Sequence, residues 1–412
     1  MRLAGRDINA AVTQLYGRYG PVFAFGVGPL RFVWLVGPEA GRFVTIEAAA
    51  QLALGPAYGF LRPVGGDTAL ITSDEPEHLQ RRRLVQPAFH RERLEHLDAL
   101  IEARLGGLFE RCAGHTLDLY AVLRGCVLGL ICEVLLGESA SRTGLTADIA
   151  QMMKFANLPL QFQLLKVPLP ATPWARFTAA RRRADGAFYR ELAARRARGE
   201  PGGDVIGLLL AARDSSGHGL SDTEIRDQAV SLVAAGFETT SAAVVWAVYE
   251  LLRRPELLAE LRVALADNPE PPLLGQVIKE TLRLYPPAPA VLRQATTALG
   301  FGGVRIPAGQ RVAFSIYATH RLAALYPDPD AFRPERWAGL KPDPYSYLPF
   351  GGGRRYCIGS SLATRILTLG LARLLRDFEI SPAWTQPVTQ AGNTLHPKGG
   401  LPLRVQRRES VS

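Results

Sequence analysis

Cysteine is scarce in this chain, and the few cysteines present are badly spaced for a zinc site. Four occur in 412 residues and none belongs to a CxxC pair, so we expect no structural zinc. Four cysteines in a chain of this length also make no disulfide framework, which indicates a reducing compartment. They are Cys112, Cys126, Cys132 and Cys357.

Long apolar runs are missing as well. No run of about 18 consecutive apolar residues occurs, so we expect no transmembrane helix. Residues 1–20 are polar with a helical pattern and lack the apolar core of a signal peptide. These absences predict a soluble cytoplasmic protein that does not insert into a membrane.

Lysine is rare and arginine is abundant. Lysine occurs at five positions, which leaves 43 arginines among the 48 basic residues, and the formal net charge is +10. The arginines alternate with Asp and Glu along helical segments and form no basic stripe, so nucleic-acid binding is not expected. With 47% hydrophobic and 21% charged residues, the composition is globular and excludes a disordered or fibrous protein.

Strand patterns are confined to short segments, and most of the chain has helical periodicity. Residues 23–37 predict two strands joined by a Gly-Pro turn. Residues 303–318 predict a hairpin around Pro307-Ala308-Gly309. We expect a helical core over about 74–285 and 358–376. No segment resembles an interdomain linker, so residues 1–412 are expected to form a single, mainly α domain with a small β part.

For one helix the sequence predicts both the start and the end. Ser221 and Glu224 form an S-x-x-E capping box. A largely apolar pattern then continues to Leu252, and Pro255 ends it. About 30 residues rising 1.5 Å each make a helix of about 45 Å. Because it is apolar on nearly all sides, it should run through the core.

The centre of this helix has an unusual composition. It reads Ala235-Gly236-Phe237-Glu238-Thr239-Thr240-Ser241. Glycine weakens a helix interior, and Ser or Thr can bond back to earlier carbonyls and bend it. A glutamate in a buried apolar helix needs a partner or a function. Two interpretations remain open, a functional site and a locally weak helix with a solvent-facing Glu238.

The most informative segment surrounds the last cysteine. It runs from Phe350 to Gly359, reads FGGGRRYCIG, and precedes a helical pattern. The free N–H groups and dipole of a helix N-terminus favour a thiolate at Cys357. The glycines let the backbone approach something flat or bulky. Cys357 is then a buried structural thiol, a catalytic nucleophile or an axial ligand of haem iron.

This segment resembles the haem-ligand loop, F-x-x-G-x-R-x-C-x-G, of the cytochrome P450 family. Other motifs match the family in the same order. Glu280-Thr281-Leu282-Arg283 resembles its E-x-x-R pair, and Pro334-Glu335-Arg336-Trp337 resembles the segment whose arginine completes an ion triad with that pair. Residues 235–239 resemble its oxygen-activating motif. Without these matches, Glu280 and Arg283 would be taken as a surface pair.

The resemblance, which runs from Tyr19 to Leu401, implies a cytochrome P450 fold with a long central helix. It also implies haem b, iron protoporphyrin IX, with Cys357 as the protein's ligand to the iron. His78 and Arg82, spaced i, i+4, match positions that bind the haem propionates, although such a pair alone is more often a surface face. The other implied cofactor contacts are Arg293, Arg355, Phe350, Gly353, Gly359 and Ala235.

The resemblance further implies a monooxygenase in which Glu238 and Thr239 deliver protons during dioxygen activation. The expected substrate is a hydrophobic small molecule, such as a terpenoid, steroid, fatty acid or polyketide. The chain has no flavin or iron–sulfur motif, so electrons should come from an acidic ferredoxin with its NAD(P)H-dependent reductase. Alternatives are a P450-type oxidase that couples radicals into C–C or C–O bonds, a peroxygenase, and a non-catalytic haem-binding protein.

Overall fold

The structure is a computed structural model of the chain. It describes residues 7–28, 31–90, 96–137, 144–156, 158, 163, 166–199, 202–385, 390–391 and 394–409. The chain forms two compact units, each built from several segments. Unit 1 contains residues 1–53, 98–124 and 239–412, and unit 2 contains residues 54–97 and 125–238. The expectation of a single domain over residues 1–412 stays a prediction.

Unit 1 contains a mixed five-stranded sheet. Its strands, in spatial order, are β1 (Val22–Phe25), β2 (Phe32–Leu35), β8 (Arg311–Ser315), β5 (Ala290–Ala295) and β3 (Leu52–Ala53). β1 and β2 pair antiparallel, with Phe23 opposite Trp34, which confirms the hairpin expected over 23–37. β2 and β8 pair parallel. Leu35, Val312 and Phe314 are buried in a core cluster on this sheet.

The second expected hairpin is wrong in its pairing. β7 (Val304–Ile306) pairs with β6 (Leu299–Phe301), whereas β8 belongs to the five-stranded sheet. Gly302 and Gly303 join β6 to β7 with φ of 57° and 76°. Two successive positive φ angles make the two-residue turn whose twist matches paired strands. The residues at 307–309 therefore connect two sheets, and 316–319 form the short helix α16 (Ile316–Thr319).

Two further small sheets were not expected. β4 (Thr116–Asp118), β12 (Pro402–Arg407) and β9 (Phe378–Pro382) form a three-stranded antiparallel sheet. β10 (Gln390–Ala391) pairs with β11 (His396–Pro397). β4 lies within residues 74–285, where a helical core was expected. These strands are too short for a period-2 pattern, and their partners lie far away in the sequence.

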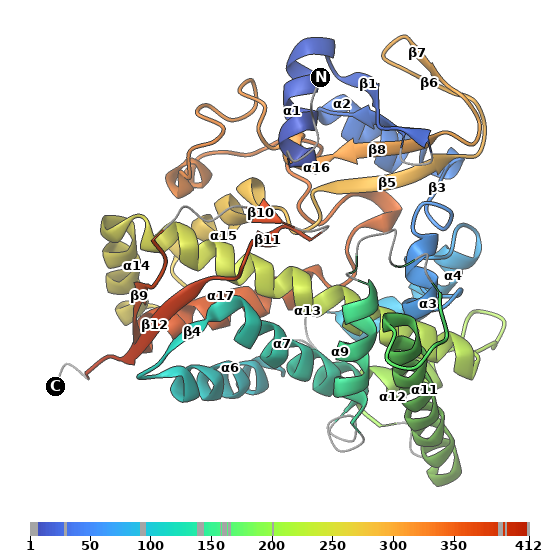
Figure 1. Ribbon diagram of the computed structural model, residues 1–412, viewed down its shortest axis with the longest axis horizontal. Helices are drawn as coiled ribbons and strands as arrows, with labels where there is room; N and C mark the ends of the chain where they lie inside the picture. Colours follow the sequence, from blue (N-terminus) through green and yellow to red (C-terminus); the bar gives the residue numbers. More distant parts are fainter. Residues whose placement is uncertain are drawn as a thin grey trace. The chain divides into compact units, whose positions relative to one another are not determined.

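The helices that lie wholly in unit 1 are found beside these sheets (Figure 1). They are α1 (Ile8–Tyr19), α2 (Pro38–Arg42), α6 (Asp98–Cys112), α14 (Pro255–Asp267), α15 (Pro272–Leu284), α16 and α17 (Ser360–Asp377). α17 packs closely on α6 at Gly370. A Cβ added at this glycine would lie 3.0 Å from a methyl carbon of Leu105. An ion pair joins the same two helices, with Arg365 Nε 2.6 Å from Asp98.

Unit 2 is helical in the part that the structure describes. Its helices are α3 (Arg62–Gly65), α4 (Glu77–Val85), α9 (Leu145–Ala156), α11 (Pro173–Arg198) and α12 (Val205–Ala211), with parts of α7 (Leu119–Leu136) and α13 (Asp222–Leu252). α9 packs along α11, and the rings of Phe155 and Phe177 lie 4.8 Å apart.

α13 confirms the predicted long helix and its start (Figure 1). Ser221 Oγ accepts from Glu224 N at 3.2 Å, and the Glu224 carboxylate accepts from Ser221 N at 3.0 Å. By length and composition α7 and α13 could each cross a membrane, but 61% and 67% of their most apolar windows are buried inside the protein. Core helices of soluble proteins meet the same criterion.

Candidate functional site

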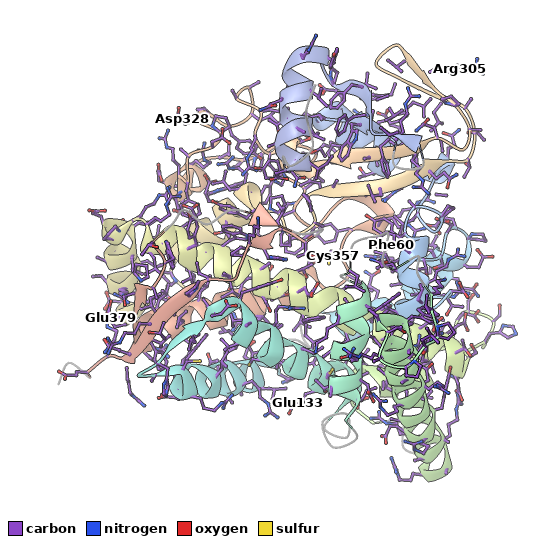
Figure 2. All side chains as sticks on the ribbon, viewed as in Figure 1. Phe60, Glu133, Arg305, Asp328, Cys357 and Glu379 are labelled. Carbon is purple, nitrogen blue, oxygen red and sulfur yellow. The ribbon has the colours of Figure 1, made fainter. Side chains whose placement is uncertain are left out.

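The cysteine loop lies directly before α17, as the sequence predicts. A 3₁₀ turn over Gly353–Arg355 precedes Cys357, whose N–H donates to the Phe350 carbonyl at 2.9 Å. Its own carbonyl accepts from Ser360 N at 3.4 Å, at the start of α17. Cys357, which is labelled in Figure 2, is exposed, so the interpretation as a buried thiol is wrong. None of the four cysteines forms a disulfide.

The glycines of this loop have a packing role. Gly353 has φ of +61°, and a Cβ at this position would lie 2.1 Å from the Thr45 carbonyl oxygen. A Cβ at Gly352 would lie 3.2 Å from side-chain atoms of Thr45 and Leu348. The loop therefore rests on the helical turn Phe43–Glu47. Gly359 differs, because it has φ of −90° and nothing within 4 Å of its Cβ direction.

Unit 1 also holds two predicted propionate ligands. Arg293 lies on β5 and is buried, with 4% of its surface exposed. Its Nη1 donates to the Leu292 carbonyl at 2.8 Å. Arg355 is half-buried in the turn before Cys357. A guanidinium such as that of Arg293 can bind a carboxylate ligand bidentately.

The other two predicted propionate ligands lie on α4 in unit 2. His78 is only 1% exposed, so it does not belong to a solvated surface face. Its Nδ1 lies 2.9 Å from a Glu75 carboxylate oxygen. Arg82, one turn later, is half-buried. Arg81, which precedes Arg82 on the same helix, donates from Nε to Glu224 at 2.9 Å, whereas Arg83 is exposed.

The centre of α13 is continuous helix, and its glutamate is buried. Glu238 is 8% exposed, so a solvent-facing side chain is excluded. Thr239 is half-buried and Ala235 is exposed. A Cβ at Gly236 would approach the Ile131 methyl group to 2.8 Å, so this glycine lets α13 and α7 pack closely. The structure therefore holds a buried carboxylate at Glu238, with Thr239 next to it in the sequence.

The ion triad is present and is larger than predicted. Glu280 and Arg283 on α15 are fully buried, with Arg283 donating to both carboxylate oxygens at 2.8 and 2.9 Å. Arg336 Nε donates to Glu280 at 3.1 Å. Trp337 Nε1 and Arg333 N also donate to Glu280, each at 2.9 Å. The interpretation as a surface pair is therefore wrong.

His320 supports the same region and was missed by the sequence analysis. Its Nδ1 lies 3.1 Å from the Arg283 carbonyl, and its Nε2 accepts from Leu348 N at 2.9 Å. Burial, with Arg283 and Arg321 nearby, lowers the pKa of His320 to about 3. The neutral ring therefore links α15 to the segment before the cysteine loop. No motif in the sequence marks this histidine.

The donor set of the described residues suits haem. In that part of the chain no three His, Cys, Asp or Glu side chains gather where they could hold a metal ion. A porphyrin supplies four nitrogen ligands itself and needs only an axial ligand from the protein. The exposed Cys357 before α17 fits the place of that axial ligand, and the buried Arg293 fits a propionate of the porphyrin.

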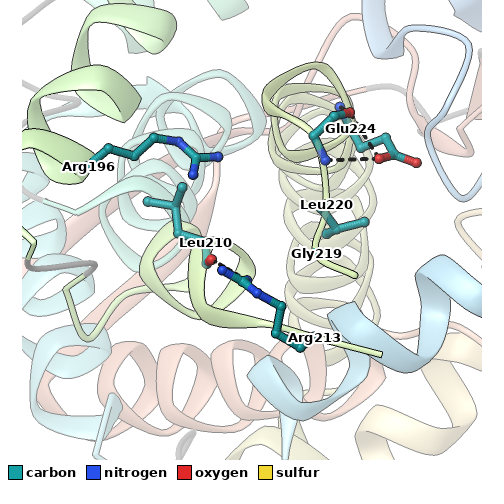
Figure 3. Close-up of a pocket in the computed structure, with 7 residues that line it drawn as sticks. Arg196, Leu210, Arg213, Gly219, Leu220 and Glu224 are labelled. Carbon is teal, nitrogen blue, oxygen red and sulfur yellow. Dashed lines mark hydrogen bonds between the residues drawn. The ribbon is translucent and has the colours of Figure 1, made fainter. Parts of the chain in front are cut away.

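A separate surface cavity of about 340 Å³ lies at the start of α13 (Figure 3). It is lined by Arg196, Leu210, Arg213, Gly219, Leu220, Ser221 and Glu224. Two of its charged residues are in ion pairs, Arg196 with Asp222 at 2.6 Å and Glu224 with Arg81 at 2.9 Å. Glu238 follows Glu224 by 14 residues, which is about 21 Å along a helix. The cavity is therefore remote from the candidate proton relay.

Two solved structures have this fold. A retinoic acid-bound cyanobacterial cytochrome P450 matches with a TM-score of 0.86 and 25% identity over 96% of this chain and 93% of its own. The haem domain of cytochrome P450DA matches with a TM-score of 0.86 and 26% identity over 99% and 94%. The fold therefore defines the class as that of the haem-thiolate monooxygenases.

Sequence comparison agrees. Cytochrome P450 139 of Mycobacterium tuberculosis is 34% identical over 97% of this chain and 98% of its own. Cytochrome P450 137 of the same species is 34% identical over 95% and 84%. The model of the family described as cytochrome P450 matches residues 2–403. The chain belongs to the cytochrome P450 family, and the enzyme is a monooxygenase.

Proposed function

We propose that this monooxygenase inserts one oxygen atom from dioxygen into a hydrophobic small molecule, by hydroxylation or epoxidation. The burial of Glu238 beside Thr239, in the middle of a long core helix, carries this proposal. A carboxylate kept out of bulk solvent and followed in the sequence by a threonine hydroxyl can hold and pass on the protons that dioxygen activation consumes. Members that use peroxide often lack this acid–alcohol pair.

The cofactor in this proposal is haem b, which when bound supplies the redox chemistry that activates dioxygen. Cys357 would be the thiolate ligand, in the loop that Gly353 seats on Thr45. Four basic groups would bind the two propionates, and they are His78, Arg82, Arg293 and Arg355. Contacts with the macrocycle would come from Phe350, Gly353, Gly359 and Ala235.

The proposed substrate is apolar because the segments that match the family's substrate-lining positions are apolar. They are Tyr58–Leu61, Met152–Leu165, Ala234–Ala235, Ala290–Leu292 and Thr394–Leu395. Residues 157, 159–162 and 164–165 of the second segment lie outside the described residues. A role in terpenoid, lipid or secondary metabolism fits such a substrate.

Electrons are proposed to come from an acidic ferredoxin that is reduced by an NAD(P)H-dependent reductase. The net charge of +10 favours a partner of opposite sign. Arg354, three residues before Cys357, is exposed in the cysteine loop. It is therefore available to a docking protein.

The absorbance difference spectrum of dithionite-reduced protein with and without carbon monoxide tests the haem assignment. We expect a red-shifted Soret band in the native chain, because a thiolate ligand donates electron density to the iron. Cys357→Ala should abolish this band, whereas Cys112→Ala, which removes a buried thiol of α6, should keep it. A Cys357→Ala protein that retains the band would contradict the assignment.

Coupling between electron use and product formation tests the proton relay. With surrogate ferredoxin and reductase, Thr239→Ala should divert most reducing equivalents to hydrogen peroxide, because the hydroxyl that directs protons is gone. Peroxide released per NADPH consumed is the readout, for any compound that gives a low- to high-spin shift. Thr240→Ala is the matched control, and equal peroxide yields in the two variants would contradict the role of Thr239.

A further inference from the structure

A buried tryptophan of α13 holds the segment after β10, entirely within unit 1. Trp246 is fully buried, and its Nε1 donates to the Leu395 carbonyl at 3.0 Å. Leu395 N in turn donates to the Pro287 carbonyl at 3.1 Å. Both backbone groups of Leu395 are therefore bound to other parts of the unit. Its neighbour Thr394 is half-buried.

Trp246 is itself held by a second layer. Its ring stacks on the Tyr285 ring with centroids 4.2 Å apart and an interplanar angle of 8°. The Tyr285 hydroxyl donates to the buried carboxylate of Glu250, which also pairs with Arg254. Burial and the Glu250 charge raise the pKa of Tyr285, so the phenol keeps the proton that it donates. The indole therefore stacks on a tyrosine ring that is held in place by a hydrogen-bond network with the charged Glu250 and Arg254.

The other side of the segment has a looser support. The His396 ring stacks on Tyr120 with centroids 4.9 Å apart, and β11 pairs with the two residues of β10. A two-residue strand pair is not stable on its own. The position of residues 394–397 therefore depends on the contacts of Leu395 with α13 and with Pro287.

We propose that Trp246 is a positioning residue for substrate recognition: its indole N–H fixes the Leu395 backbone and so places Thr394 against bulky hydrophobic ligands. The proposal rests on the proposed function in one respect, the substrate contact of residues 394–395. Losing one hydrogen bond to a buried carbonyl changes an equilibrium by roughly a factor of five. Small ligands that do not reach residue 394 should be unaffected.

The chain offers a matched control. Trp34 on β2 is also a buried tryptophan, at 6% exposed, and within the part of the chain that the structure describes its Nε1 has no acceptor. Trp246→Phe and Trp34→Phe remove the same atoms, but only the first removes a hydrogen bond. Effects of lost volume or general destabilisation should appear in both variants.

The first measurement is hydrogen exchange of the Leu395 amide in full-length, haem-loaded protein, followed by mass spectrometry of short peptides. We expect about fivefold faster exchange in Trp246→Phe and unchanged exchange in Trp34→Phe. The second is optical titration with imidazole and with clotrimazole, an imidazole that carries three aryl rings. The dissociation constant for clotrimazole should rise about fivefold in Trp246→Phe, and that for imidazole less than twofold.

Unchanged exchange at Leu395, or equal changes in the two variants, would overturn the proposal. Faster exchange with unchanged clotrimazole affinity would overturn its recognition part. If Trp246→Phe does not load haem, Trp246→Tyr takes its place, because it too lacks the indole N–H that bonds to the Leu395 carbonyl; native exchange and native clotrimazole affinity in that variant would again overturn the proposal. Absence of the red-shifted carbonyl band in the native chain would instead refute the proposed function, and the exchange measurement would still decide the role of Trp246.

Discussion

At the residue scale, buried charge organises the region around the family's ion triad. Glu280 is fully buried, and burial alone would raise its pKa. The hydrogen bonds and charge of Arg283 lower the pKa by more than burial raises it, so the net shift is downward. A lowered pKa means that this carboxylate stabilises the fold above its unfolded pKa. The stabilisation is lost as the pH falls through its lower value in the folded protein.

The lowered pKa of His320 predicts a second contribution to the free energy of unfolding that is lost in acid. Its pKa is about 3 in the folded protein against 6.5 for an exposed histidine. The unfolded chain therefore binds the extra proton first, and folding stability falls as the pH drops below 6.5, by up to about 1.4 kcal/mol per pH unit. Between pH 6.5 and 4.5 the loss from this residue alone should be about 2 kcal/mol.

His320→Gln tests this prediction in urea unfolding curves recorded at several pH values. The variant should be less stable than the native protein at pH 7, since it disturbs the bonds to Arg283 and Leu348. The difference should shrink by about 2 kcal/mol as the pH falls to 4.5. His218→Gln, which changes an exposed histidine, should leave the slope unchanged. Parallel curves for His320→Gln and the native protein would refute the prediction.

At the element scale, the cysteine loop is held by its contact with the turn Phe43–Glu47. Gly353→Ala would force a methyl group into the Thr45 carbonyl at a positive φ. We expect a loss of at least 2 kcal/mol of stability and a several-fold lower ratio of haem to protein absorbance. Gly359→Ala, with open space and ordinary φ, should fold with native stability. Equal stability in the two variants would show that this contact does not hold the loop.

The strands show how local pattern and tertiary pairing differ. The hairpin forms at the two-residue turn Gly302-Gly303, which joins β6 to β7. Residues Pro307-Ala308-Gly309 do not form the turn of a hairpin. A strand does lie at 311–315, inside the expected hairpin over 303–318, but its partners β2 and β5 come from 32–35 and 290–295. Helix α13 could be predicted correctly because its capping box and its apolar pattern are local features that do not depend on a distant partner.

At the scale of the whole molecule, the net charge of +10 predicts charge-steered electron transfer. The screening length falls from about 10 Å at 0.1 M salt to about 3 Å at 1 M. Stopped-flow reduction by an acidic ferredoxin under carbon monoxide should therefore slow at least tenfold between these conditions. A rate independent of salt would reject steering.

A pair of charge reversals locates the docking face. Arg354→Glu should slow reduction several-fold at low salt, because it reverses an exposed charge near Cys357. Arg305→Glu makes the same change on the β6–β7 hairpin, which Figure 2 shows away from Cys357 within the same unit. It should have little effect. Equal slowing by both variants would indicate only a general effect of net charge.

The features that could be predicted from the sequence alone are those that local chemistry specifies. The cysteine loop before a helix, the E-x-x-R pair and the capping box of α13 depend on residues within one or two turns, where spacing alone brings groups together. The family, and with it the fold class, followed from these motifs in order. The proton-relay and haem-binding roles of Glu238, Thr239, His78, Arg82 and Arg293 stay predictions.

The contacts that each of these groups makes depend on the tertiary fold and could not be predicted. It buried Glu238 and His78, paired Arg81 with Glu224, added Trp337 to the triad and placed Gly353 against Thr45. It also brought Trp246 to the Leu395 carbonyl, across 149 positions of the chain. Burial and pairing of this kind depend on segments far apart in sequence, and no local pattern records which of them meet.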